Sequence, residues 1–168
     1  MTIYLLCDIE LLLKHNITLE NYLKKTEDIN PIYIQYRDKI NNQEMMIKNL
    51  KLIVDYFKHK DTKIIINDHI KLINYCHGVH IGQEDLKQYA KNSGIDIQTF
   101  IKKLKIKYPN KTIGLSTHNK NEIIQANDFD LDYIGLGAYR ATSTKKDINI
   151  IGKKAEQLAI LSKHKVAI

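Results

Sequence analysis

The stretch Lys63-Ile64-Ile65-Ile66-Asn67-Asp68 shows the pattern that indicates the fold of this chain. A short run rich in β-branched residues predicts a strand over Lys63 to Ile66, and two polar residues follow it directly. Similar runs elsewhere bring the number of candidate strands to seven. The other six are Ile3 to Cys7, Ile32 to Tyr36, Gly78 to Ile81, Thr112 to Leu115, Tyr133 to Leu136 and Lys165 to Ile168.

Amphipathic segments lie between these strands and predict helices. They are Thr18 to Lys25, Gln43 to Lys58, His69 to Tyr75, Ile97 to Lys107, Asn119 to Ala126 and Ile148 to Lys163. In the second of them, apolar residues recur at helical spacing and are interpreted as a core stripe: Met46, Leu50, Ile53 and Phe57. Alternation of strands and helices predicts an α/β protein with a parallel sheet and right-handed crossovers.

Polar residues follow several different strands: Arg37, Asp68, Asp85, Ser116 and Thr142. In a barrel all strand ends converge on one mouth, whereas an open doubly wound sheet brings together only those near its switch point. The pattern therefore favours a (β/α)₈ TIM barrel over a doubly wound sheet.

The length of 168 residues fits one domain, residues 1–168, although a complete eight-stranded barrel typically takes about 250. No apolar run approaches the roughly 20 residues of a membrane span, and the first residues lack a basic leader with a cleavage site. We therefore expect a cytoplasmic protein without a membrane partner. The net charge of +7 is dispersed along the chain, which favours anionic small substrates over nucleic acid.

The two cysteines, Cys7 and Cys76, lie far apart in or beside apolar segments and form no C-x-x-C pair. Both are interpreted as buried structural residues. Cys76 with His77 and His80 would supply part of a zinc site, but no second ligand cluster completes a tetrahedron.

The segment Gln35-Tyr36-Arg37-Asp38-Lys39 closes the second predicted strand. Because side chains alternate along a strand, Gln35, Arg37 and Lys39 are expected on one face. An arginine fork beside a compact ammonium suits a pyrophosphate. A solvated basic strand end is the alternative.

Carboxylates follow the third and fourth strands at Asp68 and Asp85. Two carboxylates from neighbouring strand ends can hold Mg²⁺ while substrate phosphates and water complete its octahedron. Glu84 is a further candidate. Asp68 also precedes a helical pattern, so a helix cap is the alternative for this residue.

The segment Gly114 to Asn119 ends the fifth strand. Ser116 can donate a hydrogen bond to phosphate, and His118 can act as an acid or base if it faces the mouth. Helix capping is the alternative for Ser116 and Asn119. No catalytic triad is indicated.

The segment Gly135 to Lys145 follows the sixth strand. Its glycines permit tight backbone turns, and Thr142, Thr144 and Lys145 offer two hydroxyls and a charge to an anion. The segment is not a P-loop, because G-x-x-x-x-G-K-[ST] is absent.

Taken in order, five motifs resemble the thiamine phosphate synthase family: Q-Y-R-D-K, N-D, G-V-H-I-G-Q-E-D, G-L-S-T-H and Y-I-G-L-G-A-Y-R-A-T-S-T-K. The resemblance spans nearly the whole chain. It implies a barrel transferase that uses Mg²⁺ to condense an aminopyrimidine diphosphate with thiazole phosphate and releases pyrophosphate.

The resemblance also implies a role for each matching residue. Gln35 would contact the pyrimidine. Pyrophosphate would be held by Arg37, Lys39, Asn67, Ser116 and Lys145, of which the resemblance makes Arg37, Lys39, Ser116 and Lys145 catalytic. Asp68 and Asp85 would bind Mg²⁺, and Thr142 and Thr144 would receive the thiazole phosphate. The implied mechanism is dissociative, so that no protein nucleophile is needed.

Some features depart from the family pattern. Ala138 to Ala141 stands where the family has a Pro-hydrophobic-Phe-Pro segment, and Arg140 is a candidate for a further phosphate contact. The segment between Asp68 and Gly78 is short, which predicts a trimmed third helix. The match ends near the seventh strand, so we expect a truncated barrel with exposed sheet edges. Either the sequence is incomplete, or the chain is a shortened relative that forms a homodimer or has lost activity.

Three rival functions remain. A thiazole tautomerase on the same fold would use His118 in proton transfer without Mg²⁺, but the carboxylates of Asp68 and Asp85 argue against it. A non-catalytic relative would bind a phosphorylated ligand without turnover. Nucleic-acid binding is the weakest alternative.

Overall fold

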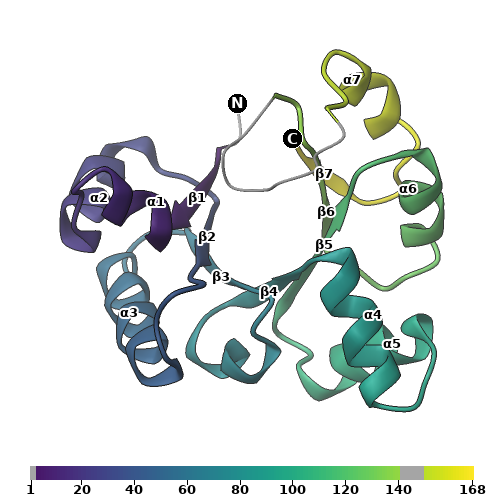
Figure 1. Cartoon of the computed structure of the whole chain (residues 1–168), viewed down its shortest axis with the longest axis horizontal. Coiled ribbons are helices and arrows are strands. Elements are labelled where there is room, and N and C mark those ends of the chain that lie inside the picture. The colour runs from purple at the N-terminus through teal and green to yellow at the C-terminus, as the bar shows by residue number, and fades with distance from the viewer. Residues whose placement is uncertain (1–2, 141–149) are drawn as a thin grey trace. The chain divides into compact units, whose positions relative to one another are not determined.

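Figure 1 shows the computed structural model, which describes residues 3–140 and 150–168. The chain divides into two compact units, Met1–Val79 and His80–Ile168. The boundary falls within strand β4 (Gly78–Ile81), so that the last residues of β4 belong to the second unit.

The first unit contains three parallel strands, β1 (Tyr4–Asp8), β2 (Tyr33–Arg37) and β3 (Lys63–Asn67). In the register, Gln35 of β2 lies between Leu6 of β1 and Ile65 of β3. The connecting elements are α1 (Ile9–Lys14), α2 (Leu19–Thr26), η1 (Glu27–Ile29), α3 (Gln43–Tyr56) and η2 (Ile70–Tyr75).

The second unit has the same organisation. Its strands β5 (Thr112–Thr117), β6 (Tyr133–Leu136) and β7 (Lys165–Ala167) are parallel to their neighbours. The helices are α4 (Gln83–Asn92), α5 (Ile97–Lys107), α6 (Lys120–Ala126) and α7 (Lys154–Ala159). Among the described residues the chain therefore has seven strands, as the sequence predicts.

In each unit the helices lie on one side of the strands. Figure 1 shows α1, α2 and α3 together on one side of β1 to β3, and α4, α5 and α6 together on one side of β5 to β7. A doubly wound sheet carries helices on both of its faces, whereas a barrel carries them only outside. The arrangement within each unit is that of barrel winding, as expected from the strand-end residues.

The core of the first unit follows from the pattern of β3. Ile64, Ile65 and Ile66 are all fully buried, which is possible because a covered parallel strand is enclosed on both faces. The stripe predicted on α3 is also buried, with Leu50 and Ile53 at 0 % exposure. Asn42 begins α3, and its side chain accepts a hydrogen bond from the backbone N–H of Met45 at 2.9 Å.

The predicted strands are confirmed to within two residues at either end, and the predicted Ile97 to Lys107 helix is confirmed as α5. The trimmed third helix is confirmed as η2, a 3₁₀ helix of six residues. Of the helix predicted over Ile148 to Lys163, the described part is helical only over Lys154–Ala159.

Two α-helices of the described residues were not predicted, nor was the short 3₁₀ helix η1. Helix α1 is six residues long and follows β1 directly. A segment of this length is too short to show a helical period of apolar residues. Helix α4 buries Leu86 and Ala90 and is otherwise mostly polar, which weakens the apolar pattern. Asp85, which was expected only to follow the fourth strand, therefore lies in the first turn of α4.

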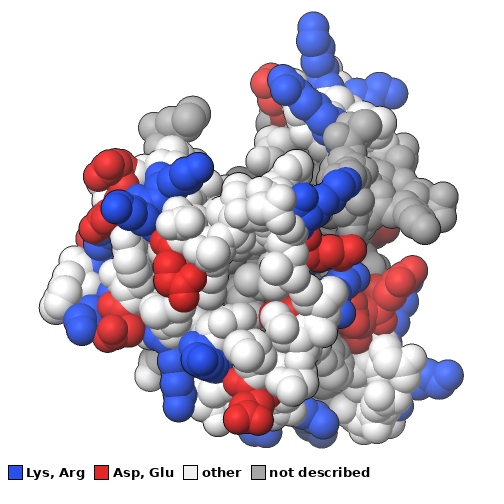
Figure 2. Space-filling view, turned by 60° about the vertical axis from the view of Figure 1, so that its left-hand side comes forward, with Lys and Arg blue, Asp and Glu red and all other residues white. Residues whose placement is uncertain are grey.

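The charged surface agrees with the predicted dispersion of lysines. On the face shown in Figure 2, Lys and Arg side chains are interspersed with Asp and Glu. No helix within the described parts of the chain combines the length and the apolar character needed to cross a membrane.

Both cysteines are free and buried, as predicted. Burial, followed by the nearby carboxylates of Asp8 and Asp38, raises the pKa of the Cys7 thiol to about 12. The Sγ atom of Cys76 lies 3.2 Å from the carbonyl oxygen of Gly78.

We expect neither thiol to react with a thiol-specific reagent at pH 8 in the folded protein. The raised pKa keeps Cys7 protonated at this pH, and only the thiolate is nucleophilic. Titration with an aromatic disulfide should detect both thiols after unfolding in guanidinium. Stoichiometric reaction of Cys7 before unfolding would contradict the buried position.

The core stripe of α3 can be tested by truncation. Leu50→Ala should lower the free energy of unfolding by roughly 2–5 kcal/mol, because it leaves a cavity at a fully buried site. Leu52→Ala on the same helix is the control, since Leu52 is 36 % exposed and should lose much less. Urea denaturation followed by circular dichroism measures both, and equal losses would contradict the assigned faces.

Candidate functional site

The first group of polar side chains lies at the carboxyl ends of β1, β2 and β3. It consists of Asp8, Gln35, Arg37, Asn67 and Asp68, and we call it the strand-end cluster. Since the three strands are parallel and hydrogen-bonded to each other, their carboxyl ends meet at one edge of the first unit.

Arg37 forms a buried ion pair with Asp8. The two residues are 9 % and 3 % exposed, and Nη1 of Arg37 donates to Oδ2 of Asp8. The other carboxylate oxygen of Asp8 accepts from the backbone N–H of Leu11 at 3.1 Å and thereby caps α1. Asp8 thus holds the guanidinium in one orientation while it starts a helix.

Asp8 is not among the site residues predicted from the sequence. The residue nevertheless carries a signal like that of Asp68, because it is an aspartate at the carboxyl end of a short apolar strand. Helix α1, which Asp8 caps, was not predicted either, so Asp8 was not recognised as a residue at the junction of a strand and a helix.

Gln35 connects β1 to β3 through its side chain. The Tyr4 hydroxyl donates to Oε1 of Gln35 at 2.7 Å, and Nε2 of Gln35 donates to Oδ1 of Asn67. Nδ2 of Asn67 in turn donates to Oδ2 of Asp68. These bonds form a continuous chain that fixes both amides and ends on the carboxylate of Asp68.

The backbone of Asp68 is left-handed, with φ of 60°. This conformation is uncommon outside glycine, although aspartate is among the residues that tolerate it. The alternative role of Asp68 as a helix cap is not supported, since η2 has His69 at its N-cap position and no side-chain cap bond. Local backbone strain of this kind is concentrated at functional sites, which motivates a binding role for Asp68.

Lys39 lies outside the strand that was expected to align it. Strand β2 ends at Arg37, so the alternation that places Gln35 and Arg37 on one face does not extend to Lys39, which is exposed in the following bend. The bend is organised by Asp38, which is 2 % exposed and accepts from the backbone N–H of Asn41 at 3.0 Å.

Asp38 also accepts from the hydroxyl of the buried Tyr36. Burial opposes ionisation of Asp38, but the hydrogen bonds from Tyr36, Asn41 and Ile40 outweigh it, so its pKa lies below the usual value. Burial, followed by the bond to Asp38, raises the pKa of Tyr36.

A second group lies in the other unit, and we call it the histidine network. It consists of His80 on β4, Gln83 on α4, Ser116 on β5 and Tyr133 on β6. His80 is 6 % exposed; its Nε2 lies 2.9 Å from Oγ of Ser116 and its Nδ1 lies 3.0 Å from the Tyr133 hydroxyl. Nε2 of Gln83 donates to the carbonyl oxygen of Ser116 at 2.7 Å.

Two glycines make room for this network. A Cβ atom on Gly135 would lie 2.9 Å from Cε1 of His80, and one on Gly114 would lie 2.2 Å from Cζ of Tyr133. The expectation that Gly135 serves a turn was therefore incomplete, because it lies within β6 and leaves space for an imidazole.

His118 and Asn119 belong to the start of α6. Oδ1 of Asn119 accepts from the backbone N–H of Glu122 at 3.0 Å, which confirms Asn119 as a helix cap. Nδ1 of His118 lies 2.9 Å from Oε2 of Glu122. Ser116, in contrast, lies within β5 and is no cap.

The remaining candidates are less defined. Asp85 and Glu84 are exposed in the first turn of α4. The guanidinium of Arg140 lies 5.8 Å from the centre of the Tyr139 ring. Thr142, Thr144 and Lys145 lie outside the described residues.

No group of three or more histidine, cysteine, aspartate or glutamate residues that could hold a metal occurs in the described part of the chain. The zinc site considered for Cys76, His77 and His80 is not formed. Nδ1 of His77 accepts from the backbone N–H of Ile64 at 3.0 Å, and His80 belongs to the histidine network.

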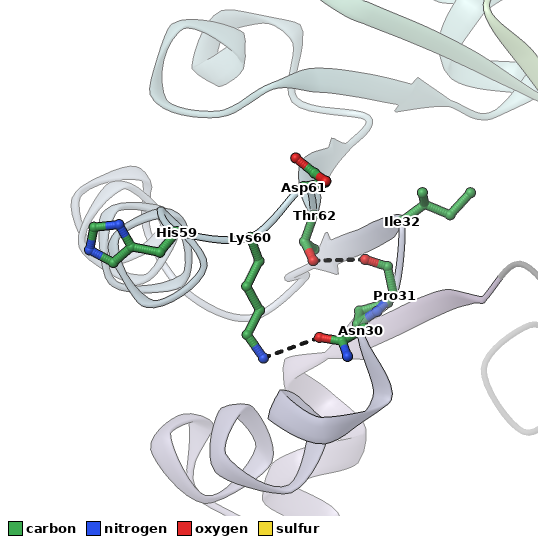
Figure 3. A pocket seen from close by; sticks show the side chains of 7 residues that line it. All are labelled: Asn30, Pro31, Ile32, His59, Lys60, Asp61 and Thr62. Atoms are coloured by element: carbon green, nitrogen blue, oxygen red, sulfur yellow. Dashed lines mark hydrogen bonds between the residues drawn. The ribbon is translucent and has the colours of Figure 1, made fainter.

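A hollow of about 360 Å³ lies beside the amino ends of β2 and β3, away from the strand-end cluster. Figure 3 shows Lys60 directed across it, where Nζ donates to Oδ1 of Asn30 at 3.3 Å. The Thr62 hydroxyl donates to the carbonyl oxygen of Pro31 at 2.7 Å. These groups bind each other, so we interpret the hollow as part of the loop packing at the amino ends of the strands. In barrel proteins this end contributes to stability, and the active site lies at the other end.

Comparison with known proteins identifies the family. A family model described as "Thiamine monophosphate synthase" matches residues 3–164. The chain belongs to this family. A relative named thiamine-phosphate synthase, from Lawsonia intracellularis, is 33 % identical over 139 residues, which are 81 % of this chain and 58 % of that protein.

Two further proteins show the extent of the likeness. A thiamine-phosphate synthase from Methanosarcina mazei is 37 % identical over 116 residues, covering 68 % of this chain and 43 % of that protein. A solved structure of a thiamine phosphate pyrophosphorylase from Pyrococcus furiosus aligns with a TM-score of 0.75 at 20 % identity, covering 98 % of this chain and 72 % of that one. The chain thus shares its fold with that structure, while it spans little more than half the length of the first curated relatives.

The two roles of Asp8 can be separated by Asp8→Asn. Asparagine is as good an N-cap as aspartate, but it removes the charge that balances the buried Arg37. We expect the free energy of unfolding to fall by roughly 3 kcal/mol, at the lower end for a broken buried ion pair.

Asp96→Asn provides the matched control for this substitution. Asp96 caps α5 by accepting from the backbone N–H of Thr99 at 2.9 Å, and it is exposed. Urea denaturation should show little change for this variant. A loss at Asp8 no larger than at Asp96 would show that capping, and not the ion pair, accounts for the effect.

Proposed function

We propose that this chain is a thiamine phosphate synthase. The reaction is the Mg²⁺-dependent condensation of 4-amino-2-methyl-5-hydroxymethylpyrimidine diphosphate with thiazole phosphate, which gives thiamine phosphate and pyrophosphate. The observation that carries the proposal is the buried Arg37, which Asp8 holds at the carboxyl end of β2 beside the hydrogen-bonded chain from Gln35 to Asp68.

The chemistry requires that a pyrophosphate leave the pyrimidine carbon. The leaving group gains negative charge in the transition state, and cations already in place stabilise that charge without reorganisation. Arg37 meets this requirement, because its orientation is set by Asp8 before any ligand arrives. Lys39 and Lys145 add charge to the same group in the proposed complex, and Ser116 donates a hydrogen bond to it.

The pyrimidine is oriented by Gln35, and Asn67 helps to hold the pyrophosphate. Both amides are fixed by the chain that starts at Tyr4. The electron-rich pyrimidine supports a transient cation after pyrophosphate leaves, and the thiazole nitrogen then forms the new C–N bond. Thr142 and Thr144 bind the thiazole phosphate in this proposal, which places the two rings in register.

The donor chemistry fits Mg²⁺. This ion is usually bound by one or two carboxylates together with substrate phosphates, so a preformed cage of three protein ligands is not expected. Asp68, whose carboxylate is oriented by Asn67, and Asp85 would hold it. When bound, Mg²⁺ would neutralise charge on the diphosphate and so favour its departure.

The fold and setting are part of the same proposal. We assign residues 1–168 to a single domain of the (β/α)₈ TIM-barrel type, supported by helices on one side of parallel strands in each unit. We place the protein in the cytoplasm, acting on small phosphorylated substrates without a nucleic-acid or membrane partner. A homodimer is the oligomer proposed.

One contact supports a second candidate function. The bond between Nδ1 of His118 and Glu122 orients the imidazole, and a carboxylate-oriented histidine is suited to proton transfer. A thiazole tautomerase, which is an isomerase, would use His118 in this way without Mg²⁺. A relative that binds phosphorylated ligands without turnover is the third possibility for the assay to distinguish.

The proposed function is tested with purified protein and both substrates, with and without Mg²⁺. We expect thiamine phosphate by liquid chromatography only when Mg²⁺ is present. Metal-independent isomerisation of the thiazole that His118→Ala abolishes would identify the tautomerase instead. Binding of either substrate without formation of any product would indicate a non-catalytic protein that binds phosphorylated ligands.

Substitution of Arg37 tests the residue assignment. We expect Arg37→Ala to lower kcat by roughly 100-fold or more, with a smaller change in the KM for thiazole phosphate, because the guanidinium acts on the departing pyrophosphate. Arg37→Lys should recover only part of the loss, since an ammonium cannot donate in a planar fork. Equal changes in kcat and in thiazole KM would contradict the role.

A further inference from the structure

The histidine network links a buried tyrosine to a serine that the proposed function places on the substrate. Tyr133, His80 and Ser116 form an unbroken hydrogen-bonded series on β6, β4 and β5, with distances of 3.0 and 2.9 Å at the two imidazole nitrogens. Tyr133 is 2 % exposed and His80 is 6 % exposed, whereas Ser116 is only half-buried. The series therefore runs from two buried rings to a half-buried serine.

We propose that His80 and Tyr133 are positioning residues that keep the Ser116 hydroxyl available as a hydrogen-bond donor to a phosphate oxygen of the diphosphate substrate. This inference rests on the proposed function for the identity of the ligand. The donor arrangement itself is a property of the free protein and can be measured without turnover.

The direction of the two hydrogen bonds decides what Ser116 can do. A neutral imidazole carries one N–H donor and one acceptor nitrogen. If Nε2 were the acceptor, the Ser116 hydroxyl would donate to it and would have no proton left for a ligand. If Nε2 carries the proton, it donates to Oγ of Ser116, and the hydroxyl proton is directed elsewhere.

Tyr133 selects the second arrangement. A phenol has a pKa near 10 and is a much stronger acid than a neutral imidazole N–H, so the favoured bond runs from the Tyr133 hydroxyl to Nδ1 of His80. With Nδ1 accepting, the proton of the neutral imidazole resides on Nε2 and is donated to Ser116. An ionised phosphate oxygen only accepts hydrogen bonds, so Ser116 in this state is complementary to it.

The surroundings hold the three groups in place. His80 packs where Gly135 lacks a side chain, and Tyr133 packs where Gly114 lacks one, so neither ring can shift far. Gln83 binds the carbonyl oxygen of Ser116 and anchors the backbone that carries the hydroxyl. A rigid donor avoids reorganisation when the ligand binds, which is the usual source of its catalytic effect.

The first experiment determines the tautomer of His80 in the free protein by ¹⁵N NMR of the imidazole. The resonance is assigned from its loss in His80→Gln. We expect the wild type to hold the proton on Nε2, and we expect Tyr133→Phe to shift the population toward the Nδ1–H form. A wild-type His80 imidazole protonated on Nδ1 would overturn the inference, even if Tyr133→Phe does not fold.

The second experiment is a double-mutant cycle in the synthase assay. Tyr133→Phe should lower kcat roughly 10-fold in the wild type, because the donor at Ser116 is no longer held. In Ser116→Ala it should cause no further loss, because Tyr133 acts only through Ser116. An equal loss in both backgrounds would show a purely structural role and would sink the inference.

Tyr36→Phe is the matched control for this cycle. Tyr36 is also a fully buried tyrosine with a bonded hydroxyl, but its partners are Asp38 and Asn49. Any effect of Tyr36→Phe on kcat should be the same with and without Ser116. Coupling of Tyr36 to Ser116 as strong as that of Tyr133 would overturn the specific link.

Failure of the proposed function would be visible separately. If the wild type makes no thiamine phosphate, calorimetry with Mg²⁺ and inorganic pyrophosphate replaces the kinetic readout. Weaker binding in both Ser116→Ala and Tyr133→Phe, without additivity in the double variant, would support the positioning role while the synthase assignment fails. Unchanged binding in Tyr133→Phe would refute the positioning role.

Discussion

The buried ion pair between Arg37 and Asp8 is the interaction on which the first unit depends. A guanidinium that is 9 % exposed is stable in its charged form only if a counter-charge and hydrogen bonds replace water. Asp8 supplies both, and its other oxygen begins α1. The same carboxylate therefore links β1 to β2, caps the start of α1 and orients the cation that is proposed to bind pyrophosphate.

In the second unit the corresponding constraint is steric. Two buried rings, His80 and Tyr133, occupy space that any Cβ on Gly135 or Gly114 would fill. Glycine weakens β structure, but at these two strand positions the buried rings occupy the space that a Cβ would need. Each unit thus presents a preorganised polar group at its strand ends, built on rigid elements and supported from the core.

Much of the candidate site was predictable because parallel strands place their last residues at one edge. Gln35, Arg37, Asn67 and Asp68 were identified in this way, and the structure joins Gln35, Asn67 and Asp68 by hydrogen bonds and Arg37 to Asp8. Lys39 was grouped with them by strand alternation, which fails once β2 ends at Arg37. Asp8 and the histidine network were missed, since they depend on partners at least 29 residues away in the chain.

The sequence by itself determined the order of strands and helices, the buried stripe of α3 and the motifs of the family, because these follow from local periodicity and from short runs of residues. Only the tertiary structure decided which groups bind each other. The folded chain shows that Asp68 does not cap η2 and that Gly135 leaves space for a ring. It also shows which atom faces each nitrogen of His80. Contacts of this kind depend on register and packing, which no local pattern encodes.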